Sequence, residues 1–122
     1  MNVRTVILIL MMLVSLDANA AGDICTRIAE MANGAKAQIP AYMSGRKVIG
    51  KGRAYFYTAP DERCRDNRTY VIPGDRVEAY ADLQKFTLAT YWSSNGNDVS
   101  GWILSTRLAE TGTGIGPKAE HK

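Results

Sequence analysis

The chain has 122 residues, with 15 lysines and arginines against 12 acidic residues, a formal net charge of +3 and a sequence pI of about 9.0. This length supports one domain of ordinary size and excludes a chain of several domains. The excess of positive charge is too small to indicate nucleic acid as a partner.

The N-terminal residues have the features of a secretory signal peptide. A short positive segment ends at Arg4, an almost unbroken apolar run extends from Val6 to Leu16, and Ala18-Asn19-Ala20 supplies a small-residue cleavage pattern. We therefore predict that residues 1–20 are a signal peptide and that the mature chain is periplasmic or secreted. An uncleaved membrane anchor is the alternative, but an apolar run of about eleven residues is too short to span a hydrocarbon layer of ~30 Å. We expect no stable membrane anchor after cleavage.

Both cysteines, Cys25 and Cys64, lie in the predicted mature chain. In an oxidising compartment, two cysteines in a small domain most often form a disulfide. A metal site and a catalytic thiol are the alternatives. The only histidine, His121, lies close to the C-terminus, which disfavours a metal site and leaves a catalytic thiol without a base. We predict a Cys25–Cys64 disulfide, no metal site and no cofactor.

Residues 21–50 are predicted to form an N-terminal helix followed by a polar, basic linker. The helix is expected over Asp23–Gln38, with Asp23 as its N-cap and Pro40 preventing its continuation. Its apolar residues recur at the spacing of one helix face, at Ile24, Ile28, Met31, Ala32 and Ala35. We expect this face to pack on the rest of the domain; docking of the helix to a partner is the alternative.

Short strands separated by turn signals dominate residues 51–109. Strands are expected at 52–57, 76–81, 86–92 and 101–104, with a long polar loop at 58–70 and a hairpin tip at 93–100. Strand alternation sets Tyr55 and Tyr57 opposite Ala54 and Phe56, and it directs Val77, Ala79 and Ala81 inward. This spacing indicates a mostly β fold, a small barrel.

The order of these motifs resembles the bacterial SH3-like (SH3b-type) domain of small exported periplasmic proteins. The resemblance covers residues 50–109 and rests on the strand and Pro60 loop, the Pro73-Gly74-Asp75 turn, and Gly101-Trp102-Ile103-Leu104 followed by Ser105-Thr106-Arg107-Leu108. It implies a five-to-six-stranded barrel and a binding role.

The same resemblance implies which residues line a ligand groove. SH3-like domains bind peptides or peptidoglycan stems through aromatic side chains beside the first loop. By resemblance, Tyr57, Phe86 and Trp102 lie nearest that groove, and Thr87, Ala89 and Tyr91 point inward. The opposite face of that strand, with Phe86, Leu88 and Trp92, is then unusually apolar.

Catalytic side chains are scarce. Asp61 and Glu62 are adjacent in the predicted loop, where neighbouring carboxylates seldom converge on one substrate atom, and we interpret them as solvated. Glu78 and Asp82 are separated from other carboxylates in sequence, and we expect solvent to separate them as well. No nucleophile with a positioned base can be assembled, so we predict that the protein is not an enzyme.

Positive charge is concentrated in the first half of the barrel segment. Residues 45–76 contain eight basic side chains against four acidic ones, whereas residues 77–108 contain two against three. The predicted loop is therefore basic and would attract an acidic surface or an anionic polymer; a merely solvated loop is the alternative. We expect a partner site formed by Tyr57, Phe86, Leu88 and Trp102 and flanked by Arg63 and Arg65.

Residues 110–122 are rich in glycine and charge and lack apolar periodicity, so we predict a disordered tail. The glycines at 112, 114 and 116 follow no strand-to-helix unit, which excludes a phosphate-binding loop.

Three function hypotheses remain. We expect a non-catalytic exported protein that binds another periplasmic or secreted protein, as an immunity or inhibitor factor does. A peptidoglycan-targeting or envelope-accessory module is the second hypothesis; such modules are usually fused to hydrolases. A small cell-wall enzyme is the third, and the residue inventory disfavours it.

Overall fold

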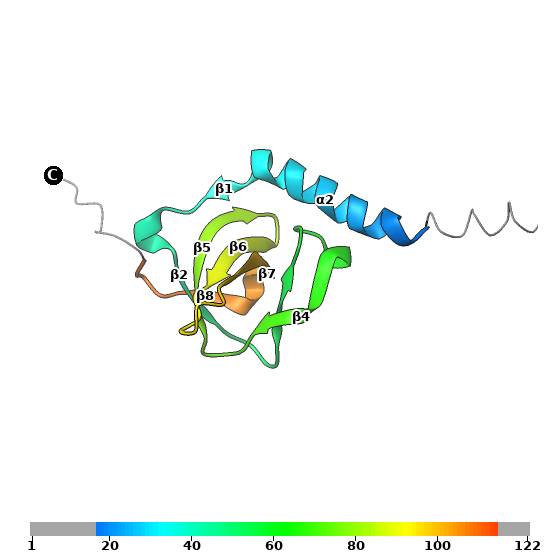
Figure 1. Ribbon diagram of the computed structural model, residues 1–122. Coiled ribbons are helices and arrows are strands. Elements are labelled where there is room, and N and C mark those ends of the chain that lie inside the picture. The colour runs from blue at the N-terminus through cyan, green and yellow to red at the C-terminus, as the bar shows by residue number, and fades with distance from the viewer. Residues whose placement is uncertain (1–16, 115–122) are drawn as a thin grey trace, which may run out of the picture.

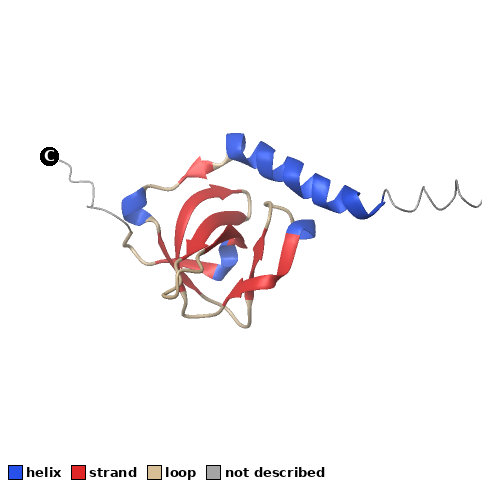
Figure 2. Cartoon of the chain, in the orientation of Figure 1, coloured by secondary structure: helices blue, strands red, loops and turns tan. Residues whose placement is uncertain are grey.

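The computed structural model describes residues 17–114, which form one strongly curled antiparallel sheet and one α-helix lying along it (Figures 1 and 2). The helix is α2, Asp17–Ala35, and three short 3₁₀ helices are η2, Ala41–Met43, η3, Glu62–Cys64, and η4, Ser105–Arg107. The strands are β1 Ala37–Gln38, β2 Gly45–Val48, β3 Ala54–Tyr57, β4 Arg65–Val71, β5 Arg76–Leu83, β6 Phe86–Tyr91, β7 Val99–Leu104 and β8 Leu108–Glu110. They are arranged in the order β4-β3-β7-β6-β5-β2-β8, with β1 also paired to β5.

The mostly β architecture with an N-terminal helix is confirmed, but the described sheet has eight strands rather than five or six. Two of the additional strands lie in predicted irregular segments. β2 lies in the expected linker, between β5 and β8, and β4 lies in the expected loop, paired with β3. β4 is an edge strand whose side chains are mostly exposed, and β2 has only four residues, of which Val48 alone is apolar. Neither strand therefore shows an apolar alternation.

Cation–aromatic contacts attach β4 to β3. The Arg65 guanidinium lies 4.9 Å from the centre of the Tyr55 ring, and the Arg53 guanidinium lies 4.3 Å from that of Tyr70. The two tyrosine rings meet edge to face at 6.0 Å. Such contacts stabilise a polar strand without an apolar alternation.

Two hydrophobic clusters lie on opposite faces of the sheet. Inside the curl, the buried members are Val48, Ala54, Phe56, Val71, Val77, Ala89 and Ile103. On the outer face, the buried members are Tyr57, Phe86, Trp102 and Ala32 of α2, with Leu83, Leu88 and Leu104 packed against them. The predicted alternation in β3 and β6 is confirmed for Phe56 and Ala89, which face inward. Because α2 covers the other face, β6 is buried on both.

The helix differs from its predicted extent and orientation. It begins at Asp17, so Asp23 is a helical residue, paired with Arg27 at 3.0 Å, and not an N-cap. Ala32 is buried against the sheet, whereas Met31 is 70% exposed. The predicted apolar face is therefore wrong in part, because the disulfide at Cys25 turns that residue toward the sheet. Most of the predicted signal peptide lies outside the described residues.

A β-bulge at Tyr80 changes the face of β5. Ala79 pairs with Ala89, but Ala81 pairs with Leu88, so Tyr80 has no partner on β6. Directly paired residues share a face, and Leu88 belongs to the outer cluster. Ala81 is buried as expected, but beneath the outer face and not inside the curl.

The predicted tail is partly ordered. β8 extends to Glu110, Thr111 donates its backbone N–H to the carbonyl of Gly45 at 3.2 Å, and the N–H of Gly45 donates to Thr113 at 2.7 Å. The prediction of a disordered tail is therefore wrong for residues 110–114, because they form hydrogen bonds with β2 and the residues beside it. Residues 115–122, with His121, lie outside the described residues.

No helix within residues 17–114 combines the length and apolar character needed to cross a membrane.

Candidate functional site

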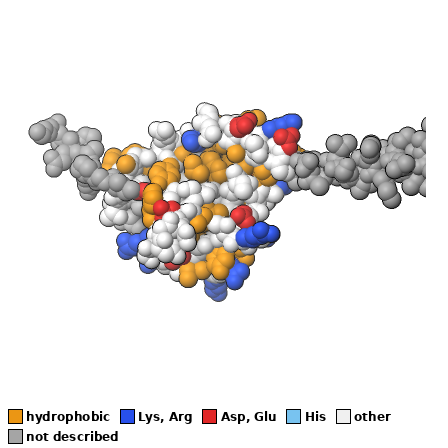
Figure 3. All heavy atoms as spheres, viewed as in Figure 1, with side chains coloured by type: hydrophobic (Ala, Val, Ile, Leu, Met, Phe, Trp, Pro, Cys, Tyr) orange, Lys and Arg blue, Asp and Glu red, His pale blue; other side chains and the backbone are white. Residues whose placement is uncertain are grey.

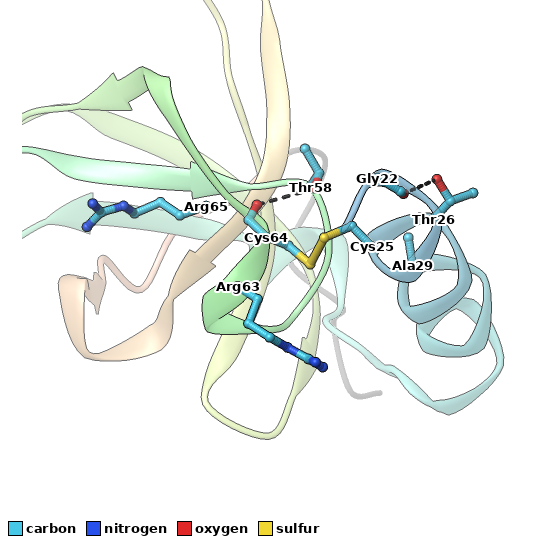
Figure 4. Close-up of a pocket in the computed structure, with 8 residues that line it drawn as sticks. All are labelled: Gly22, Cys25, Thr26, Ala29, Thr58, Arg63, Cys64 and Arg65. Carbon is cyan, nitrogen blue, oxygen red and sulfur yellow. Dashed lines mark hydrogen bonds between the residues drawn. A yellow bond between two sulfur atoms is a disulfide. The ribbon is translucent and has the colours of Figure 1, made fainter. Parts of the chain in front are cut away.

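The predicted disulfide is present and joins α2 to η3, which precedes β4 of the sheet (Figure 4). Cys25 and Cys64 lie 39 residues apart in sequence, with Cα atoms separated by 5.7 Å. The bridge forms one side of a groove of about 540 Å³ between the helix and η3. The groove is lined by Gly22, Cys25, Thr26, Ala29, Thr58, Arg63, Cys64 and Arg65.

Arg63 is bound within its own turn. Its Nε donates to Asp61 Oδ1 at 2.9 Å and its Nη2 donates to Oδ2 at 3.0 Å, while its backbone N–H also donates to Oδ1 and caps η3. The side-chain and backbone hydrogen bonds from Arg63 lower the pKa of Asp61 from 3.8 to about 2.

Arg65 points away from Arg63, as Figure 4 shows. Its Nε donates to Asn67 Oδ1 at 2.7 Å, and its guanidinium lies over Tyr55. Both arginines are on the surface, as predicted, but each is engaged by its own neighbours. They do not form one basic rim.

The predicted aromatic site is not on the surface. Tyr57, Phe86 and Trp102 are 8%, 1% and 4% exposed, and Leu88 packs against them partly buried. The rings of Tyr57 and Phe86 meet edge to face at 5.0 Å. The expectation of an exposed apolar strand face is wrong, because α2 covers that face and uses these side chains as a second core.

A different site lies where the segment from β1 to η2 runs alongside β5. A pocket of about 320 Å³ is lined by Ile39, Ala41, Ser44, Glu78, Ala79, Tyr80 and Trp92. Figure 3 shows hydrophobic side chains exposed over the region of η2. Backbone hydrogen bonds hold the pocket wall, since the N–H of Ile39 donates to Tyr80 at 2.8 Å and the N–H of Ala79 donates to Ser44 at 2.7 Å.

Glu78 forms the polar part of this pocket. Glu78 is only 7% exposed, so protein and not solvent surrounds most of this side chain, contrary to the expectation that solvent separates it from other carboxylates. Tyr80 Oη and Trp92 Nε1 both donate to Oε2 at 3.1 Å, and Ser44 Oγ lies 3.3 Å from Oε1. Glu78 faces outward opposite Thr90, and the segment around η2 covers it. Sequence reasoning missed this because the covering segment looked like a linker.

Two aromatic side chains beside this carboxylate remain in contact with solvent. Trp92 is 56% exposed and Tyr80 is 40% exposed. Tyr80 projects from the bulge of β5, and Trp92 follows the last residue of β6. The sequence did not distinguish Trp92 from the buried Trp102, because the strand predicted over 86–92 included Trp92, whereas β6 ends at Tyr91.

Among the described residues, no group of three or more histidine, cysteine or acidic side chains is placed to hold a metal ion. The arrangement combines two exposed aromatic rings with a buried carboxylate that accepts a hydrogen bond from each of them.

No family model matches the chain, and neither the curated proteins nor the solved structures provide a match.

Proposed function

We propose that the chain is a non-catalytic exported protein that binds another protein outside the cytoplasm, as an immunity or inhibitor factor does. Export is supported by the predicted signal peptide and by the Cys25–Cys64 disulfide, since structural disulfides persist mainly in oxidising compartments. An SH3-like type of barrel is part of the proposal and is supported by the η4 turn between the last two strands.

The observation that carries the proposal is the exposed pair of Tyr80 and Trp92. Both donate to the same Glu78 oxygen, so their positions are restrained before any partner binds. Restrained aromatic side chains lose little entropy on association, and tryptophan and tyrosine are enriched among the residues that dominate binding energy. This surface replaces the sequence-predicted site around Phe86 as the proposed contact face.

Site-specific photo-crosslinking in intact cells tests the proposal. A benzoylphenylalanine at position 41 lines the pocket, and one at position 68 on the edge strand β4 is the matched control. We expect one discrete protein adduct from position 41 and none from position 68. An adduct that carries peptidoglycan fragments would instead support the wall-binding alternative, and the absence of any adduct at 41 would contradict both.

Reconstitution with the captured protein then measures the contribution of Trp92. Truncating an exposed aromatic anchor typically costs about 2 kcal/mol or more of binding energy, roughly a thirtyfold loss of affinity. We expect Trp92→Ala to weaken the complex by this amount in isothermal titration calorimetry. Ile72→Ala, which truncates an exposed side chain outside the pocket, should leave the affinity unchanged. Equal affinities for Trp92→Ala and the wild type would place the contact elsewhere.

A further inference from the structure

The Glu78 carboxylate has unused hydrogen-bonding capacity at Oε1. Ser44 Oγ lies 3.3 Å from Oε1 and 2.7 Å from the carbonyl oxygen of Ala41. A hydroxyl group has one hydrogen, and the shorter distance assigns it to Ala41. Oε2 receives hydrogen bonds from Tyr80 and Trp92, so Oε1 is the oxygen that lacks a good donor.

The negative charge of Glu78 also lacks a counter-charge. The ion pairs of the described residues are Arg27–Asp23, Arg46–Glu110, Arg63–Asp61 and Lys85–Glu62, and none includes Glu78. The basic residues on the same face as Glu78 are Arg76, two residues earlier on β5, and its partner Lys47 on β2, and neither forms an ion pair with Glu78. Arg46 lies opposite Val77 and directs its guanidinium to backbone carbonyls and Glu110. Buried carboxylates are ordinarily paired, because removing an isolated charge from water is costly.

The walls of the pocket suit a cation. Trp92 directs its indole N–H at the carboxylate, which leaves the ring itself exposed beside the charge. Tyr80 is held in the same way through its hydroxyl. A cation near such rings is attracted by their negative faces, and the remaining walls at Ile39 and Ala41 accept an aliphatic stem.

We propose that this pocket takes the cationic end of a lysine or arginine side chain from the partner protein. The inference rests on the proposed function for the identity of the partner, but the preference for a cation comes from Glu78 and the two aromatic rings beside it. The ammonium or guanidinium group donates to Oε1 and supplies the missing counter-charge, and its stem lies between Trp92 and Ile39. The buried carboxylate thereby makes the site selective for a basic partner residue.

Nuclear magnetic resonance titration of the disulfide-bonded protein tests this preference without the partner. The probes are N-acetyl-lysine methylamide and N-acetyl-arginine methylamide, and the control is N-acetyl-norleucine methylamide, which keeps the aliphatic stem but has no charge. We expect the two cationic probes to shift the Trp92 indole N–H resonance saturably, with dissociation constants on the order of millimolar. The norleucine probe should produce no saturable shift.

Two variants of the pocket and one matched control show whether the cationic probes bind at Glu78 and Trp92. Glu78→Gln preserves the shape of the side chain and should weaken binding of the cationic probes by about tenfold, because a charge-assisted contact is lost. Glu62→Gln removes the same charge from the exposed start of η3, outside the pocket, and should bind the probes as the wild type does. Trp92→Leu, followed through the Tyr80 amide resonance, should also weaken binding and covers the case in which Glu78→Gln does not fold.

The outcomes separate this inference from the proposed function. If norleucine binds as well as lysine, or if Glu78→Gln and Trp92→Leu both bind the cationic probes normally, the cation preference is wrong, whatever the crosslinking shows. If the cationic probes bind but no protein is crosslinked at position 41, the proposed function fails while the cation preference of the pocket stands. A muropeptide that binds the pocket with a lower dissociation constant than the lysine probe would assign the site to the cell wall. It would contradict the proposal that the pocket takes a side chain of a partner protein.

Discussion

At the scale of single residues, the charged side chains of the predicted basic loop interact mainly with one another and with aromatic rings. Arg63 is bound to Asp61, Arg65 lies over Tyr55, and Lys85 Nζ is 2.6 Å from Glu62 Oε1. Exposed pairs of this kind contribute little to stability. They do reduce the charge that is available to an acidic partner, so the total charge of the segment overstates its attraction.

Replacing Arg63 tests the cause of the Asp61 pKa. In Arg63→Gln the guanidinium donors are lost, so the pKa of Asp61 should rise from about 2 toward its ordinary value of 3.8. Because the folded-state pKa is lowered, any stability linked to Asp61 is present above pH 3.8 and is lost as the pH falls through about 2. Carboxyl ¹³C shifts followed between pH 6 and pH 2 measure this pKa directly.

Arg65→Gln is the matched control, because Arg65 is bound to Asn67 and not to Asp61. It should leave the Asp61 titration unchanged. A wild-type Asp61 that titrates near 3.8 would show that the Arg63 contact does not persist in solution.

At the scale of elements, α2 and the outer face of the sheet form a second core. Ala32 allows close approach because it has only a methyl group, and Phe86, Tyr57 and Trp102 fill the space between helix and sheet. Aromatic side chains that suggested a ligand groove in the sequence therefore stabilise the packing of the helix.

Truncating Phe86 distinguishes a core residue from a contact residue. Phe86 is 1% exposed, and removal of a buried phenylalanine ring typically costs about 3–5 kcal/mol. We expect Phe86→Ala to lower the free energy of unfolding by this amount in urea titrations. Ile72→Ala, at an exposed position, should change it by no more than about 0.5 kcal/mol. A small effect of Phe86→Ala would return this ring to the list of candidate contact residues.

At the scale of the whole molecule, the disulfide connects two parts that share a modest contact area. Apart from the Cys25–Cys64 bridge, the contact of α2 with the outer cluster depends on Ala32, which is the only described helix residue buried in that cluster. A covalent link between the helix and η3 restricts the unfolded chain by closing a long loop. The position of α2 over Phe86 should therefore depend on the oxidation state of the cysteines.

The double variant Cys25→Ser with Cys64→Ser tests this dependence. On the chain-entropy argument, loss of a bridge across 39 residues lowers the free energy of unfolding by roughly 3–4 kcal/mol. Hydrogen exchange should accelerate in α2 before it does so in β5 and β6. Met31→Ser on the exposed side of the helix is the control and should leave both quantities near wild type. Ready alkylation of both cysteines in the native exported protein would contradict the bridge itself.

Local patterns in the sequence were sufficient for several features of the fold. The alternation of Phe56 and Ala89, the Asn95-Gly96 turn with its φ of 84° at Gly96, and the Cys25–Cys64 pair all follow from neighbouring residues or from composition. These features depend on backbone sterics, on strand periodicity and on redox environment, and each operates over a few residues or on the chain as a whole.

Only the tertiary structure decided which surfaces are buried and where the candidate site lies. Whether Phe86 faces solvent depends on where α2 lies, and whether Glu78 is solvated depends on the segment around η2, which is distant in sequence. The polar strands β2 and β4 form because neighbouring edges supply their hydrogen bonds, which no local pattern records. Burial is a relation between distant segments, and so the pocket at Glu78, Tyr80 and Trp92 could be recognised only after the chain had folded around it.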